Sequence, residues 1–202
     1  TLGFSIFYPS ALGGRSVGKR ERILEEAEKL FSQKGYYGLS LSELLARCDI
    51  PKGSFYYYFP QGKIQLMQET LRYSYSKMIN GIRKNIFTQK TALAAYECMA
   101  EHLAGGLLGR RYFASLLLSM ISIESVYLDK QIQATCKEIY EDWQRLYAEH
   151  LAGFGFGPEE SVTTAQAIFA LIHGSMVSSW IKQDPTDLML AKASLRRLIG
   201  DR

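Results

Sequence analysis

Apolar side chains recur along most of this 202-residue chain at every third or fourth position, which is the spacing of one face of an α-helix. The first such stripe ends at Lys34-Gly35, where a lysine suits the last helical turn and a glycine the left-handed cap. Its members are Ile23, Ala27, Leu30 and Phe31. No segment alternates as a strand does, so the pattern predicts an all-α fold.

Longer stripes follow, and one of them, from residue 64 to 82, keeps its face over about five turns. The stripes comprise Ile64, Met67, Leu71, Tyr75, Met78 and Ile82; Met99 and Leu103; Phe113, Leu116, Leu117 and Met120; and Ile132, Cys136, Ile139, Trp143, Leu146 and His150. Breaks are expected at Gly105-Gly106 to Gly109, Tyr127 to Asp129, Gly153 to Pro158 and Asp184-Pro185, where turn-forming residues gather.

Two short helices joined by Asp49-Ile50-Pro51 are predicted between Ser40 and Phe59. Ser40 is expected to cap the first of them and to form a capping box with Glu43. The apolar face of this helix consists of Leu41, Leu44, Leu45 and Cys48. Pro51 suits the first turn of the next helix, where its missing N–H is no loss. Such a pair indicates a helix-turn-helix.

The second helix carries an unusual run of aromatic residues, Phe55 to Phe59. Phe55 and Phe59 share its inner face, one turn apart. Because successive helical residues are rotated by about 100°, Tyr56, Tyr57 and Tyr58 cannot all enter one small core. Exposed tyrosines beside Lys52 and Ser54 offer hydroxyl donors for phosphate oxygens and ring faces for thymine methyl groups. This combination is typical of a recognition helix in a DNA major groove.

Gly35-Tyr36, Ser40 to Leu45, and Lys52 to Phe59 followed by Lys63 resemble the DNA-binding domain of the TetR (tetracycline repressor-like) family. The resemblance covers roughly residues 19 to 75. Asp49 stands where the family commonly has glycine, and Pro51 stands where a serine or threonine cap is common. Asp tolerates left-handed backbone, so we expect the turn to be kept.

The resemblance implies an N-terminal three-helix bundle with a helix-turn-helix, followed by a larger C-terminal helical domain for ligand binding and dimerisation. The expected boundaries are an arm at residues 1–17, disordered or not native to the protein, a DNA-binding domain at 18–63, and the ligand-binding and dimerisation domain at 64–202. The expected DNA-binding residues are Lys19, Arg20, Ser40, Ser42, Lys52, Gly53, Ser54, Tyr56, Tyr57, Tyr58 and Lys63.

Positive charge is concentrated in the same part of the chain. Residues 15–84 hold 13 lysines and arginines against 7 acidic residues, a surplus of +6, whereas residues 85–202 hold 11 against 13, a balance of −2. A basic N-terminal part fits contact with DNA phosphates.

The three cysteines, Cys48, Cys98 and Cys136, are far apart and odd in number, which fits a reducing cytoplasm. Each lies on an apolar stripe, so packed thiols are favoured over redox sensors. Residues 2–12 are apolar but lack a basic flank and are too short to span a bilayer. We therefore predict a cytoplasmic protein without a membrane segment.

The helix predicted from Pro158 to Lys182 has two apolar faces. On one of them Ala170, Gly174 and Ser178 recur at steps of four, so a second helix can approach closely. The resemblance implies a homodimer formed by the last two helices, whereas burial of both faces within one chain is the alternative. The expected interface residues are Ala167, Ala170, Leu171, Gly174, Ser178 and Leu195.

Methionine and aromatic residues are abundant on the later stripes. Most of them belong to the core, but the resemblance implies a cavity for a small effector, and such walls suit an apolar or aromatic ligand. The expected lining is Met99, Phe113, Met120, Tyr140, Trp143, Phe169, His173, Met176 and Trp180. His173 can equally be a hydrogen-bonded core histidine.

Enzymatic chemistry has little support in this sequence. Gly14-Arg15-Ser16-Val17-Gly18 matches the letters of a nucleophile elbow, but no strand precedes it. No metal-binding or phosphate-cradling motif is found, so we expect no catalysis, cofactor or metal. The leading hypothesis is a transcriptional repressor that binds a palindromic DNA operator and is released by a small ligand. The alternative is a helical ligand-binding or scaffold protein that no longer reads DNA.

Overall fold

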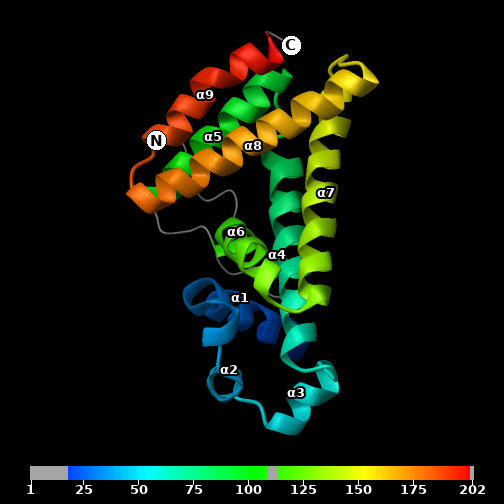
Figure 1. Cartoon of the computed structure of the whole chain (residues 1–202), viewed down its shortest axis with the longest axis vertical. Helices are drawn as coiled ribbons and strands as arrows, with labels where there is room; N and C mark the ends of the chain where they lie inside the picture. The colour runs from blue at the N-terminus through cyan, green and yellow to red at the C-terminus, as the bar shows by residue number, and fades with distance from the viewer. Residues whose placement is uncertain (1–17, 109–112, 201–202) are drawn as a thin grey trace. The chain divides into compact units, whose positions relative to one another are not determined.

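The computed structural model describes residues 18–108 and 113–200, without the side chains of residues 108 and 113–116. The described elements are α1 (Lys19–Gly38), α2 (Leu41–Cys48), α3 (Lys52–Tyr58), α4 (Lys63–Asn85), α5 (Ala92–Leu108), α6 (Phe113–Glu124), the short 3-10 helix η1 (Ser125–Tyr127), α7 (Lys130–Ala152), α8 (Pro158–Lys182) and α9 (Thr186–Ile199) (Figure 1). No strand occurs in these residues, and the predicted all-α fold is confirmed. The expected arm at residues 1–17 lies outside the described residues.

The chain divides into two compact units. The described part of the N-terminal unit comprises residues 18–78 and 113–139, and that of the C-terminal unit comprises residues 79–108 and 140–200. The division passes through α4 and α7, so each of these helices contributes to both units. The domain boundary expected between residues 63 and 64 coincides with the beginning of α4 and stays a prediction.

The first helix of the N-terminal unit is built on the stripe that the sequence predicts. Ile23, Ala27, Leu30 and Phe31 are fully buried, and α1 packs against α2 and α6. Its regular helical backbone is interrupted at Gly35, whose φ of 68° lies in the left-handed region that favours glycine. The predicted glycine cap is therefore confirmed, and Tyr36 to Gly38 form a further turn after it.

The turn between α2 and α3 keeps the expected geometry despite its unusual residues. Asp49 is left-handed, with φ 52° and ψ 53°, and Pro51 is extended directly before α3. The expected capping box is wrong. Ser40 Oγ lies 2.6 Å from Ser42 Oγ, while the Glu43 carboxylate pairs with Lys34 and Arg47. Two cations hold this carboxylate more strongly than one backbone N–H would, because charge-assisted hydrogen bonds are the stronger ones.

The C-terminal unit contains α5, α8 and α9, which pack on one another (Figure 1). The inner face of α9 consists of Leu188, Ala191, Leu195 and Ile199, all buried. The break expected from Gly105-Gly106 to Gly109 does not begin at its first two glycines, because α5 continues through them to Leu108; Gly109 lies outside the described residues. A glycine costs a helix about 1 kcal/mol relative to alanine. Burial of Ala104 and Leu107 offsets this cost, and helices in proteins owe most of their stability to such packing.

The remaining expected breaks are confirmed at η1, between α7 and α8, and between α8 and α9. Cys48 and Cys136 are buried and Cys98 is half-buried, and burial raises the pKa of all three thiols. Within residues 18–108 and 113–200, none of the helices combines the length and apolarity that crossing a bilayer demands.

Candidate DNA-binding surface and effector cluster

Helix α3 presents its tyrosines to solvent and its phenylalanines to the core. Phe55 and Phe59 are fully buried and their rings lie 5.4 Å apart. Tyr57 is 80% exposed and Tyr56 is 42% exposed, while Tyr58 is half-buried. The expectation that the three tyrosines cannot all enter the core is confirmed. Their outward rings and hydroxyls form a surface that can meet a nucleic-acid groove.

The N-terminal end of α3 adds small and basic groups to this surface. Lys52 and Gly53 are exposed, Ser54 is half-buried, and the Lys52 ammonium lies 6.0 Å from the centre of the Tyr56 ring. A Cβ atom added to Gly53 would meet nothing within 4 Å, so the backbone here is open to an approaching ligand. Ser40 and Ser42, the expected phosphate contacts of α2, are also exposed.

The basic residues of α1 are exposed at its beginning. Lys19 and Arg20 both lie on the surface, but Arg20 already has partners within the unit. Its guanidinium pairs with the Glu69 carboxylate of α4 and lies 5.6 Å from the centre of the Phe59 ring. Arg20 therefore ties the beginning of α1 to α4 and to the end of the helix-turn-helix, besides any phosphate that it meets.

Lys63 occupies a more enclosed position than an ordinary phosphate-binding lysine. Its ammonium donates a hydrogen bond to the Leu39 carbonyl at 2.7 Å and lies 4.7 Å from the centre of the Tyr36 ring. Burial lowers the pKa of Lys63, against which the charge of Glu124 acts. This lysine connects the beginning of α4 to the segment between α1 and α2, and its expected role at phosphate stays a prediction.

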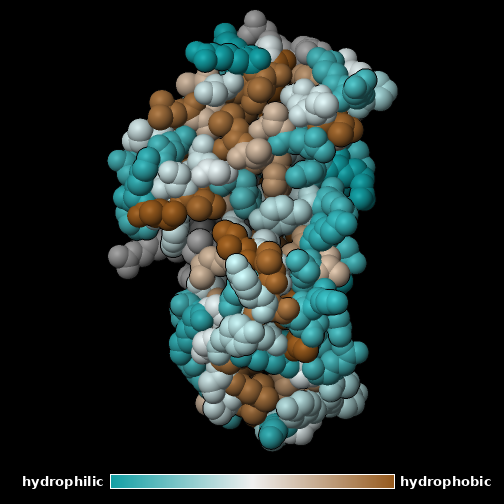
Figure 2. Space-filling view, in the orientation of Figure 1, coloured by the Kyte–Doolittle hydropathy of each residue, from teal (hydrophilic) through white to brown (hydrophobic). Residues whose placement is uncertain are grey.

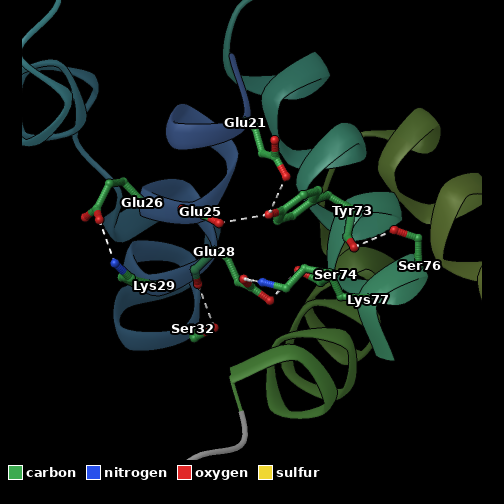
Figure 3. Close-up of polar contacts among 10 residues, drawn as sticks. All are labelled: Glu21, Glu25, Glu26, Glu28, Lys29, Ser32, Tyr73, Ser74, Ser76 and Lys77. Atoms are coloured by element: carbon green, nitrogen blue, oxygen red, sulfur yellow. Dashed lines mark hydrogen bonds and ion pairs between the residues drawn. The ribbon is translucent and has the colours of Figure 1, made fainter. Parts of the chain in front are cut away.

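A polar seam, which the sequence pattern did not reveal, connects α1 and α4 in the N-terminal unit (Figure 3). Buried Glu28 accepts a hydrogen bond from the Ser74 hydroxyl at 2.8 Å and pairs with the Lys77 ammonium at 3.1 Å. The Tyr73 hydroxyl lies 3.0 Å from a Glu25 carboxylate oxygen. Burial and the charge of Glu25 raise the pKa of Tyr73, which keeps this phenol protonated as a donor. Glu28 directly follows Ala27 of the apolar stripe of α1, but no nearby residue indicates its partners on α4.

Four of the expected effector residues meet in the C-terminal unit. The Tyr140 hydroxyl and His173 Nε2 lie 2.9 Å apart, and the Phe169 and His173 rings stack with their centres 5.1 Å apart. The Trp143 ring meets the Phe169 ring edge-on at 5.1 Å. Burial lowers the pKa of His173 to about 4, so its imidazole is neutral near pH 7. Such a cluster offers aromatic faces together with one polar pair.

The other expected effector residues lie apart from this cluster. Met99 is buried, and its sulfur accepts a hydrogen bond from the Tyr147 hydroxyl. Met176 packs with Ala104 and Leu188, and Trp180 is half-buried. Met120 belongs to the N-terminal unit and is 37% exposed, and the side chain of Phe113 lies outside the described residues.

Sequence reasoning missed a second aromatic group in the same unit. The Phe87 and His150 rings stack with their centres 3.7 Å apart, and the Tyr96 hydroxyl lies 3.3 Å from His150 Nδ1. Burial lowers the pKa of His150 to about 4. Tyr147 links the two groups, since its ring meets those of both Tyr96 and Trp143. The predicted stripe of α7 contained Trp143 and His150, which was the available signal, but it did not include Tyr147.

The surface of α8 and α9 combines small and apolar side chains, and Figure 2 shows hydrophobic side chains gathered over these helices. Ala170 and Gly174 are exposed, whereas Ala167, Leu171 and Ser178 are half-buried. Ser178 also donates a hydrogen bond to the Asp187 carboxylate. Leu195, an expected interface residue, is fully buried within the chain and offers no surface to a partner. The large exposed apolar side chains of the two helices are Val162, Ile181, Met189, Leu190 and Leu198.

Two known families match successive parts of the chain. Residues 23–70 match the bacterial regulatory proteins of the tetR family, and residues 92–194 match the C-terminal domain of LmrA/YxaF-like transcriptional regulators. The chain belongs to the TetR family. The first match includes the helix-turn-helix with its exposed tyrosines, and the second includes the aromatic cluster and most of α9. This protein is therefore a TetR-family DNA-binding transcriptional regulator, as the sequence predicts.

Relatives of this TetR-family protein align over most of its length. The uncharacterized HTH-type transcriptional regulator YxaF of Bacillus subtilis is 24% identical over 180 residues, which are 89% of this chain and 94% of YxaF. The HTH-type transcriptional regulator LmrA of the same organism is 27% identical over 174 residues, 84% of this chain and 90% of LmrA. Both relatives are described as HTH-type transcriptional regulators.

NemR of Escherichia coli, an HTH-type transcriptional repressor, is 52% identical over 40 residues, 20% of either chain. The crystal structure of its reduced form matches the fold with a TM-score of 0.80 at 22% identity, covering 92% of this chain and 100% of that one.

Proposed function

We propose that this TetR-family regulator is a repressor that binds a palindromic operator as a homodimer and is released by a small apolar or aromatic ligand. The observation that carries the DNA-binding part is the exposure of Tyr56 and Tyr57 next to Lys52 on α3, above a core of Phe55 and Phe59. The description of NemR as a repressor supports the direction of regulation.

A two-fold dimer would present two α3 helices to one face of DNA. Helix-turn-helix dimers bind half-sites whose centres lie about 34–36 Å apart, or a multiple of one turn, which makes the operator palindromic. The proposed dimer surface lies on α8 and α9, where exposed Ala170 and Gly174 allow close helix approach and exposed Leu190 and Leu198 supply apolar area. A cytoplasmic location would follow from binding to chromosomal DNA.

The proposed effector site centres on Tyr140, Trp143, Phe169 and His173. Aromatic rings beside the Tyr140–His173 pair suit a planar apolar ligand that carries a hydrogen-bonding group. The Tyr140–His173 hydrogen bond can open to meet such a group, since a neutral imidazole can donate or accept according to its tautomer. The ligand lowers operator affinity only if it binds the DNA-incompetent state more tightly than the DNA-competent state.

The function is tested by measuring fluorescence anisotropy of labelled DNA from the region flanking the gene, with an unrelated duplex as control. We expect the wild-type protein to bind the flanking DNA at least a hundredfold more tightly than the unrelated duplex, since specific binding usually exceeds non-specific binding by more than this. Equal affinity for both DNAs would instead favour a ligand-binding or scaffold protein. Mass spectrometry of small molecules that co-purify with the protein would identify candidate effectors, and each would then be titrated into the protein–DNA complex.

A further inference from the structure

The segment from Gly35 to Ser40, which contains the last turn of α1 and leads to α2 and which we call the α1–α2 connection, is contacted by the last residue of α6. The helical run of α1 stops at Gly35, and the next backbone N–H, that of Tyr36, donates a hydrogen bond to Glu124 Oε2 at 3.2 Å. A Cβ atom added to Gly35 would lie 3.3 Å from the same oxygen. The Glu124 carboxylate thus lies directly against the backbone where α1 ends, and it satisfies a donor that the helix cannot.

A second residue holds this connection through a different group. Lys63, at the beginning of α4, donates to the Leu39 carbonyl and lies over the Tyr36 ring. Glu124 from α6 and Lys63 from α4 therefore hold the segment between Gly35 and Ser40, which leads directly into the helix-turn-helix. Glu124 and Lys63 also attract each other, since the charge of Glu124 acts on the pKa of Lys63. The contacts connect three helices of the N-terminal unit through one short segment.

We propose that Glu124 is a positioning residue for DNA recognition: its carboxylate fixes the α1–α2 connection and so sets the orientation of α2 and α3 relative to α1. The role rests on the proposed function as a DNA-binding regulator. Through this contact, α6 acts on the helix-turn-helix directly and not by way of α4. Glu124 itself need not touch DNA, and its negative charge would be repelled by phosphates if it did.

The test compares Glu124→Ala, Glu124→Gln and a control, Glu138→Ala. Glu138 is an exposed glutamate of the same unit that also forms an interhelical ion pair, with Arg72, and exposed pairs contribute little. For each protein, affinities for the operator and for an unrelated duplex are measured together with thermal melting. Hydrogen exchange of the Tyr36 amide is followed without DNA.

We expect Glu124→Ala to bind the operator about tenfold more weakly, because the hydrogen bond to Tyr36 no longer favours the DNA-competent orientation of α2 and α3, while the unrelated duplex is bound as before. The Tyr36 amide should exchange faster. Glu124→Gln should retain most of the operator affinity, because its side-chain carbonyl can still accept from Tyr36. The control should resemble the wild type in every measurement.

The proposal is overturned if Glu124→Ala binds the operator as the wild type does, or if Glu124→Gln loses as much affinity as the alanine variant. Tighter binding of both DNAs by both variants would overturn it too, since it would mean that Glu124 acts by repelling phosphate. A wild-type protein that binds the two DNAs equally would defeat the proposed function and this role with it. Unchanged Tyr36 exchange in Glu124→Ala would defeat the positioning role alone.

Discussion

At the scale of single residues, substitutions of two nearby aromatic side chains of α3 should have different effects: one should weaken operator binding, and the other should lower the free energy of unfolding. Tyr57→Phe removes one hydroxyl from an exposed side chain, so operator binding should weaken by roughly 0.5–1.5 kcal/mol with almost unchanged melting. Phe55→Ala empties a fully buried site and should cost roughly 3–5 kcal/mol of unfolding free energy. Melting curves and operator affinities measured side by side distinguish the two. Equal destabilisation by both changes would mean that Tyr57 is not on the outer face.

Two lysines offer a second comparison at this scale. Lys52→Ala should weaken binding to all DNA sequences alike and flatten the plot of log affinity against log salt by about one unit, because phosphate contacts carry little base information. For Lys63→Ala the sequence predicts the same change, but the hydrogen bond of this lysine to the Leu39 carbonyl gives it a structural task as well. Titrations from low to high salt measure both slopes. If neither slope changes, the two lysines do not face phosphate.

At the scale of elements, the seam between α1 and α4 should be sensitive to the loss of one partner, because the remaining buried polar group is then left without its hydrogen bond. Glu28→Ala leaves the buried Ser74 hydroxyl without its carboxylate, which should cost roughly 1–3 kcal/mol. Glu26→Ala is the control on the same helix, because the half-buried Glu26 pairs with exposed Lys29 as an i,i+3 pair, and such pairs contribute about 0.2–0.5 kcal/mol. Urea unfolding measures both. Similar losses of unfolding free energy in the two variants would show that the buried contacts of Glu28 contribute no more to stability than the Glu26–Lys29 pair does.

Elements whose conformation depends on nearby residues could be predicted from the sequence, and those that depend on distant packing could not. The left-handed backbone of Gly35 and Asp49 follows from the residues themselves, and the inward side of α3 follows from its helical spacing. The continuation of α5 through Gly105 depends on packing against α8 and α9. The pairing of Glu28 with Ser74 joins residues 46 positions apart, so no local pattern shows it.

For the candidate effector cluster too, the sequence predicted some features and tertiary packing determined the others. Tyr140 and Trp143 were both candidates from the sequence, and the structure places their rings 6.4 Å apart on α7. Their contact with Phe169 and His173 depends on how α8 packs against α7, and helical periodicity says only that each helix has an apolar face. Met120 failed to join them because α6 belongs to the other unit. Residue type and periodicity therefore predicted candidates, and tertiary packing selected among them.

At the scale of the whole molecule, the proposed dimer can be disrupted by a substitution that should not destabilise the folded monomer. A side chain at Gly174 would meet nothing within 4 Å of its Cβ in its own chain, and glycine is a poor helix former, so Gly174→Leu should leave the monomer at least as stable as before. Across a close helix interface the added volume would hold two chains apart. Operator affinity should then fall, because the two half-sites are no longer bound by one linked molecule.

Analytical ultracentrifugation, melting and operator titration of Gly174→Leu test this, with Ala134→Leu as control because Ala134 is exposed on the part of α7 that belongs to the N-terminal unit. We expect the control to sediment as the wild type does, and Gly174→Leu to sediment as a folded monomer that binds DNA with the affinity of one half-site. An intact dimer in Gly174→Leu would place the interface elsewhere. The exposed Leu190 and Leu198 of α9 would then need a different partner surface, because a close approach of two chains along Gly174 is what the proposed dimer uses to bring these leucines together.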